Sequence, residues 1–262
     1  FSLWTRAPAA HFTEAYPVGN GRLGALFFGG VAGERLVLNE SSLWSGSPED
    51  PDRADAHARL PEIQRLLIEG RNAEAQELVN ATFTCAGAGS GQGNGANVPY
   101  GCFQTLGDLA LTFLDEAGRP LTGTVRNYRR TLDLTEAVAS VDFELDGVQH
   151  LRSVFASHPA QVIVYRAACA RPGGLSFEAR LRRPERAVCG SSAAQELSLV
   201  GTLTDGRGGA GLAFEGRLRC VARGARVESE DGVLSVRGAD EAWLFLAAGT
   251  SYAGPIAGAW RG

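Results

Sequence analysis

VASVDFELDGVQHLRSVFAS, residues 138–157, is the stretch of sequence that decides the fold class. From Val138 to Leu145, apolar and polar residues alternate, which is the period of a strand with one buried face. Asp146-Gly147 is a strong signal for a two-residue hairpin turn, and residues 151–157 supply the return strand. The stretch therefore predicts an antiparallel β-hairpin.

Segments of the same kind fill most of the chain. Residues 23–31 and 35–38 predict two short strands, with residues 31–34 as the turn between them. Beyond Tyr100, further strands are expected over residues 109–114, 161–169, 175–181, 197–203, 212–220, 233–237 and 242–248. About ten to twelve strands separated by turns predict a mainly β fold, a sandwich of antiparallel sheets.

One segment breaks this pattern with helical spacing. Leu60, Ile63, Leu66 and Leu67 recur as one face of a helix, Gly70 interrupts the pattern, and a second short helix follows. We therefore expect a short helical pair near residues 53–81, inserted into the β fold. Residues 85–97 read CAGAGSGQGNGAN and predict a loop, without the GK[ST] that a phosphate-binding loop requires.

Length and composition indicate a single domain over residues 1–262 and exclude several classes of function. The net charge is −4 with no basic block, so nucleic acid is not an expected partner. No apolar run approaches the roughly 18–20 residues of a membrane span. All 25 basic residues are arginine, which excludes Schiff-base lysine chemistry. Because the chain starts at Phe1, the compartment stays open: periplasmic or secreted if a signal peptide was removed, cytoplasmic otherwise.

The sequence predicts neither a metal site nor a cofactor. The four histidines lack any metal-binding spacing, and the five cysteines form no CxxC pair. Cys85 and Cys102 bracket the glycine-rich loop and could form a disulfide in an oxidising compartment. No GxSxG nucleophile motif is present, and nothing shows two carboxylates converging as a glycosidase requires. We therefore name no catalytic residue.

Three segments, residues 13–25, 38–46 and 103–109, combine glycines with amide, carboxylate and indole side chains. Such groups in tight turns suit sugar recognition, because amides and carboxylates bind hydroxyls and aromatic rings pack on the sugar's C–H face. Tight turns packed against another domain explain the same residues equally well. The candidate residues for either role are Asn20, Arg22, Asn39, Glu40, Trp44, Gln104 and Asp108.

The same segments carry a resemblance to a known family. Residues 14–25, EAYPVGNGRLGA, are similar to a signature near the start of glycoside hydrolase family 95. Residues 38–46, LNESSLWSG, resemble that family's LNEDTLWSG, with serines in place of its Asp and Thr. QTLGDL at residues 104–109 resembles a third motif, and residues 68–76 and 128–134 fit in the same order.

The resemblance implies an N-terminal β-super-sandwich followed by a linker, an (α/α)6 catalytic barrel and a small C-terminal β domain. Members of the family are inverting α-L-fucosidases, with some α-L-galactosidases. Their catalytic Glu, Asn pair and Asp lie in the barrel, so none maps onto this sequence. We therefore expect a non-catalytic N-terminal domain that packs against such a barrel, in an enzyme acting on a fucose- or galactose-containing glycan. Two alternatives stay open: a stand-alone carbohydrate-binding sandwich using Asn39, Glu40, Trp44 and Gln104, and a partner-docking module.

Overall fold

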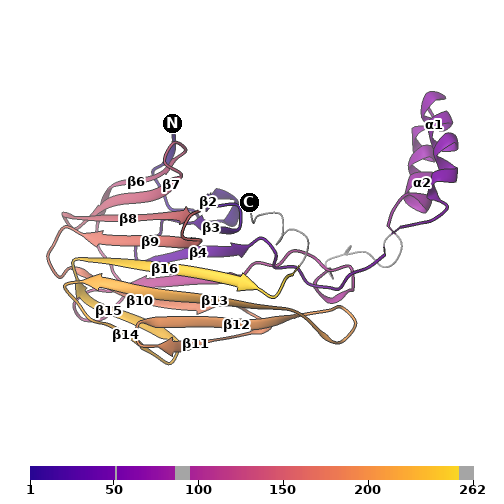
Figure 1. Cartoon of the computed structure of the whole chain (residues 1–262). Coiled ribbons are helices and arrows are strands. Elements are labelled where there is room, and N and C mark those ends of the chain that lie inside the picture. The colour runs from indigo at the N-terminus through magenta and orange to yellow at the C-terminus, as the bar shows by residue number, and fades with distance from the viewer. Residues whose placement is uncertain (51, 86–94, 254–262) are drawn as a thin grey trace. The chain divides into compact units, whose positions relative to one another are not determined.

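Two antiparallel sheets make up most of the computed structural model, which describes residues 1–50, 52–85 and 95–253 (Figure 1). One sheet has nine strands in the order β1-β6-β7-β8-β9-β16-β13-β12-β11, and the other has seven in the order β14-β15-β10-β5-β4-β3-β2. This confirms the expected mainly β, antiparallel sandwich. Contacts divide the chain into two compact units. Unit 1 comprises residues 1–43, 104–202 and the described chain from Leu212 onward, and unit 2 comprises residues 44–103 and 203–211.

The strands of the nine-stranded sheet are β1 (Ser2–Thr5), β6 (Val125–Asp133), β7 (Val138–Leu145), β8 (Val148–Ser157), β9 (Val162–Cys169), β11 (Ala187–Ala193), β12 (Glu196–Thr204), β13 (Ala210–Arg223) and β16 (Glu241–Thr250). Those of the seven-stranded sheet are β2 (Tyr16–Gly19), β3 (Leu23–Phe27), β4 (Gly33–Glu40), β5 (Gly107–Phe113), β10 (Leu175–Arg182), β14 (Val227–Glu230) and β15 (Val233–Ala239). Short 3-10 turns lie at η1 (Phe12–Glu14), η2 (Ala56–Arg59) and η3 (Gly95–Asn97).

The β7–β8 hairpin forms as the sequence predicts. Every second residue of β7 is buried, and Leu145 pairs with Val148 across the turn. Asp146 and Gly147 have φ of 48° and 82°, the positive values that such a two-residue turn requires. Alternation therefore sets the face that each residue of this hairpin presents to the core.

The sequence analysis missed five strands: β1, β2, β6, β11 and β14. Strand β6 reads VRNYRRTLD and turns the Arg130 side chain, not an apolar one, toward the interior. Strand β4 also begins earlier than expected, because Gly33 and Glu34 belong to the strand and not to a turn. In both strands a buried charged residue replaces the apolar residue that would have marked the inward face.

The core between the sheets contains charged groups as well as aromatic rings. The Arg152 guanidinium lies 3.3 Å from the centre of the Phe113 ring and donates hydrogen bonds to the carbonyl oxygens of Gly30 and, at 2.7 Å, Val31. The Arg152 side chain is fully buried. Because a guanidinium presents several donors in a fixed plane, one side chain holds two consecutive carbonyls of the β3–β4 connection.

Glu34 lies at the other end of the same connection and is also buried. Its Oε1 accepts hydrogen bonds from the backbone amides of Gly29 at 3.0 Å and Arg35 at 2.9 Å. Its Oε2 has no hydrogen-bond partner in the described part of the chain. Burial raises the pKa of Glu34 to about 7, against an opposing attraction from Arg152.

Unit 2 contains the expected helical pair, α1 (Leu60–Ile68) and α2 (Asn72–Thr82). Ile63, Leu66 and Ala75 are its buried residues. Gly70, with φ of 75°, ends α1 as a left-handed residue after the helix. No helix in the described ranges is long and apolar enough to span a membrane.

Candidate functional site

Three of the seven candidate residues, Asn20, Arg22 and Glu40, come together in unit 1. They occupy the β2–β3 turn and the end of β4, in the seven-stranded sheet. Their hydrogen bonds reach the ends of β8 and β16, which belong to the nine-stranded sheet. The cluster therefore links the two sheets of the sandwich.

Arg22 is the centre of this cluster. Its guanidinium donates to the Ala248 carbonyl at 2.7 Å and to Gln161 Oε1 at 2.8 Å, and it lies 3.5 Å from Glu40 Oε1. A rigid planar donor set suits this task, because each acceptor comes from a different strand or turn. Arg22 is thus a structural anchor, with most of its donors already in use inside the domain.

Glu40 extends the cluster to β16. Its Oε2 accepts hydrogen bonds from the Ser42 amide and the Ser42 hydroxyl, both at 2.7 Å. The Ser42 hydroxyl also shares a 2.5 Å hydrogen bond with the Thr250 hydroxyl. Both Glu40 oxygens are therefore engaged, and a buried carboxylate with these partners serves as a structural acceptor.

Asn20 fixes the turn that carries Arg22. Its Oδ1 accepts from the backbone amides of Arg22 at 3.0 Å and Leu23 at 2.8 Å, and its Nδ2 donates to the Ser157 carbonyl at 2.9 Å. Asparagine commonly stabilises turns by bonding the backbone two residues ahead. The more distant partners of this cluster could not be predicted from the sequence, because they lie more than 130 residues away along the chain.

Asn39 and Asp108 lie on the opposite face of the seven-stranded sheet. Alternation along β4 turns Asn39 away from the side that Glu40 faces. Arg35 donates two hydrogen bonds to Asp108, from Nε to Oδ2 at 3.0 Å and from a terminal nitrogen to Oδ1 at 3.2 Å. These two residues therefore do not join the Arg22–Glu40 cluster. Gln104 lies just before β5, where its backbone amide donates to the Leu43 carbonyl at 2.9 Å.

Trp44 belongs to unit 2, where it meets an aromatic residue that the candidate set did not include. Trp44 and Phe103 form an isolated antiparallel bridge, with ring centres 6.2 Å apart in an edge-to-face arrangement. Their side chains are 51% and 43% exposed. An exposed aromatic pair of this kind can pack on a sugar ring or on another protein.

A backbone clasp supports this pair in unit 2. The Ser45 amide donates to the Cys102 carbonyl, and the Ser47 amide donates to the Pro99 carbonyl at 2.8 Å. Gly46 and Gly101 have positive φ and approach the opposite backbone so closely that a Cβ atom would overlap the carbonyl oxygens of Pro99 and Ser45. Only glycine fits these positions.

No disulfide joins Cys85 and Cys102 in the described part of the chain, so the structure does not support the bridge considered from the sequence. The backbone of Cys102 is instead held by Ser45, whose hydroxyl accepts from the Cys102 amide at 3.0 Å. Within the same ranges, no three His, Cys, Asp or Glu side chains gather as a metal site.

Comparisons with known proteins identify relatives of this chain. The chain is 36% identical over 270 residues to Alpha-L-fucosidase 2 of Arabidopsis thaliana, an alignment that covers 95% of this chain and 30% of that protein. It is 30% identical over 175 residues to Probable alpha-fucosidase A of Aspergillus niger, covering 63% of this chain and 19% of that protein. The chain thus spans less than a third of the length of these curated relatives.

The fold itself recurs in a distant structure. A putative kojibiose phosphorylase from human microbiome superposes with a TM-score of 0.52 at 7% identity, covering 96% of this chain and 32% of that one. At this identity the likeness concerns the fold alone. A family model described as "Glycosyl hydrolase family 65, N-terminal domain" matches residues 3–255. With that match running through both compact units, the chain belongs to the family of glycosyl hydrolase family 65 N-terminal domains.

Proposed function

We propose that this chain is the non-catalytic N-terminal domain of an α-L-fucosidase-like glycoside hydrolase of family 95, and one domain over residues 1–262. The observation that carries the proposal is the coverage: 95% of this chain aligns with Alpha-L-fucosidase 2, but with only 30% of that protein. The family match runs from residue 3 to residue 255, which supports counting unit 2 as an insertion within one domain.

In this proposal the catalytic groups come from an (α/α)6 barrel in the longer enzyme. Inverting hydrolysis requires one carboxylic acid and one carboxylate base, with room for a water molecule. The candidate carboxylates of this chain are committed elsewhere, Glu40 to Ser42 and Arg22, and Asp108 to Arg35. The domain supports the barrel, and the fucose- or galactose-containing glycan is the substrate of the whole enzyme.

The exposed Trp44–Phe103 pair is the proposed contact with that barrel. Both rings leave about half of their surface uncovered, and the glycine clasp below them fixes their position. Aromatic residues held rigidly on a surface are enriched at protein interfaces, because they bury large areas at little cost in conformational entropy.

A chimaera tests this function. We would replace the aligned N-terminal part of Arabidopsis Alpha-L-fucosidase 2 by this chain and measure hydrolysis of an aryl α-L-fucoside. We expect the chimaera to hydrolyse the fucoside and this chain alone to be inactive. An inactive but folded chimaera, or hydrolysis by purified chain alone, would contradict the proposal. The chimaera carrying Trp44→Ala tests the contact, and Trp4→Ala, which removes another exposed indole, is its control.

A second function, a carbohydrate-binding domain, is favoured by the same aromatic pair. A sugar stacked on Trp44 would quench its fluorescence, and Trp44→Phe would remove that change while keeping an aromatic face. If fucose and galactose oligosaccharides leave the fluorescence of the native chain unchanged at millimolar concentration, this function is excluded.

A further inference from the structure

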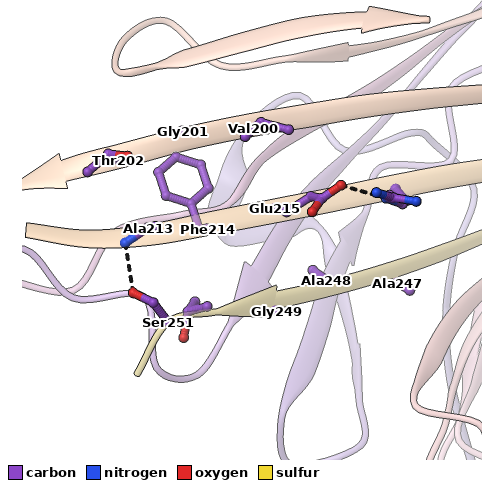
Figure 2. Close-up of a pocket in the computed structure, with 12 residues that line it drawn as sticks. Val200, Gly201, Thr202, Ala213, Phe214, Glu215, Ala247, Ala248, Gly249 and Ser251 are labelled. Carbon is purple, nitrogen blue, oxygen red and sulfur yellow. Dashed lines mark hydrogen bonds and ion pairs between the residues drawn. The ribbon is translucent and has the colours of Figure 1, made fainter. Parts of the chain in front are cut away.

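A shallow groove of about 510 Å³ crosses β12, β13 and β16 in unit 1 (Figure 2). Its floor consists of small residues on neighbouring strands, Val200, Ala213, Ala247 and Gly249. In β16, the residues that alternate with the buried ones face away from the core, and both Ala247 and Gly249 are among them. The groove therefore lies on the outer face of the nine-stranded sheet.

Several contacts hold the strands that carry the groove in place. Ser251 and Ala213 exchange two hydrogen bonds, of 2.9 Å through the Ser251 amide and 3.0 Å through its hydroxyl. The Phe214 ring points toward Gly201 (Figure 2), where a Cβ atom would overlap it. Phe214 is 3% exposed, and the Arg183 guanidinium lies 5.0 Å from its ring centre. The groove is thus formed before any ligand binds, which lowers the cost of binding.

The polar side chains of the groove carry donors and acceptors but little net charge. Arg217 Nε donates to Glu215 Oε1 at 2.5 Å, so the two charges compensate one another. Both side chains are largely exposed, at 63% for Arg217 and 43% for Glu215. Thr202 and Ser251 add hydroxyl groups to the lining. Such a lining suits a neutral ligand with many hydroxyls better than it suits an anion.

An aromatic ring lies beside the groove on the same face. Phe245 precedes Ala247 by two positions in β16, so both side chains point to the outer face, about 7 Å apart along the strand. Phe245 is 36% exposed. A ligand longer than one ring could place a hydroxyl-bearing ring in the groove and the C–H face of the next ring on Phe245.

We propose that this groove binds a neutral oligosaccharide, with the C–H face of one pyranose ring on Ala247 and Gly249 and its hydroxyls on Glu215, Arg217 and Thr202. The groove's chemistry does not depend on the function proposed above, but the choice of a fucosylated probe does. An apolar floor with a few placed polar groups can hold a sugar ring in one orientation.

The structure provides a variant that blocks the groove without disturbing the sheet. A Cβ atom on Gly249 would meet no atom within 4 Å, and the backbone there has no left-handed strain. Gly249→Leu therefore fills the groove from its floor. Gly190 in β11 is equally open and unstrained and lies outside the groove, so Gly190→Leu is the matched control. Thermal unfolding of both variants establishes that they are folded.

The test is saturation-transfer NMR of 2′-fucosyllactose, and of lactose, with the 262-residue chain. With the native chain and with Gly190→Leu, we expect saturation to reach the C–H protons of the sugar rings. Folded Gly249→Leu should bind the sugar about tenfold or more weakly. The proposal is overturned if the native chain transfers no saturation to either sugar at millimolar concentration. It is also overturned if Gly249→Leu binds as the native chain does, or if both variants lose binding equally.

Binding and hydrolysis are separate readouts. A chimaera without fucosidase activity would contradict the proposed function but would not affect the sugar-binding result. An active chimaera whose groove binds no sugar would support the proposed function and overturn the groove proposal. If the chain transfers as much saturation to lactose as to 2′-fucosyllactose, the groove binds neutral glycans without a preference for fucose. If Trp44→Ala abolishes sugar binding and Gly249→Leu does not, the proposal that the groove binds sugar is overturned. That outcome supports the aromatic pair in unit 2 as the sugar site.

Discussion

Replacing Glu34 by glutamine should remove the part of the domain's pH-dependent loss of stability that comes from ionising this buried carboxyl group. Burial raises the pKa of Glu34 to about 7, from an ordinary value of 4.5 in the unfolded chain. Because the folded state holds this proton more tightly, the contribution of Glu34 to stability falls as the pH rises from about 4.5 to 7. Above that range the loss is complete and constant.

The size of the effect follows from the shift. A difference of 7 − 4.5, about 2.5 pH units, corresponds to about 3 kcal/mol. Glutamine keeps an oxygen for the amides of Gly29 and Arg35 and cannot ionise. The free energy of unfolding of Glu34→Gln minus that of the native protein should therefore rise by about 3 kcal/mol between pH 4.5 and pH 8.

Urea unfolding followed by tryptophan fluorescence at several pH values measures this difference. Any pH-independent effect of the substitution, such as a change in packing, shifts all values equally and cancels in the comparison. Glu228→Gln removes an exposed carboxylate from β14 and should give a nearly flat difference. A flat difference for Glu34→Gln, within about 0.5 kcal/mol, would refute the reasoning, since the pH dependence follows from linkage alone.

Three further predictions concern the glycine clasp, the inter-sheet anchor and a buried histidine. Gly101→Ala should open unit 2 to proteolysis, because its Cβ would overlap the Ser45 carbonyl, whereas Gly70→Ala, which meets no atom, should cost only about 1 kcal/mol. Arg22→Ala should lower the free energy of urea unfolding by about 1–3 kcal/mol, since it leaves the partly buried acceptors on Gln161 and Ala248 unpaired. Burial lowers the pKa of His150 to about 4, so the contribution of this residue to stability is lost as the pH falls from about 6.5 to 4, and pH-dependent unfolding should show His150→Phe gaining stability relative to the native protein over that range.

The sequence was sufficient for elements whose buried face is apolar. Strands β7 and β8 and the helical pair follow directly from their periodicity, and the Asp146-Gly147 turn follows from its residues. Strand β6 was not predictable in this way, because its inward-facing Arg130 is polar and is satisfied by carbonyls of Phe28 and Glu14 more than a hundred residues away. A buried arginine cannot be distinguished from an exposed one until its distant acceptors are known.

The candidate site was predictable only in part, for a related reason. Asn20, Arg22 and Glu40 lie together in the structure, but no pattern in the sequence predicted that they meet, and their partners Gln161 and Thr250 carried no signal of their own. Asp108 was placed with them because its segment looked similar, although strand alternation turns it to the other face. Local composition thus identified the turns, and only the pairing of strands shows which side chains meet.

The hydrogen bond between Ser47 and Pro99 has a consequence for how this family can vary. This hydrogen bond brings together the two ends of the segment from residue 48 to residue 98 at the glycine clasp. The entropy of closing such a loop grows slowly, by about 0.6 kcal/mol for each doubling of its length. The clasp therefore fixes both ends of this segment, and we expect a longer, shorter or foreign segment closed at the same point to change the loop-closure entropy only slightly. A variant in which a short Gly-Ser linker replaces residues 48–98 would test this, since urea unfolding would report how much stability the segment itself contributes.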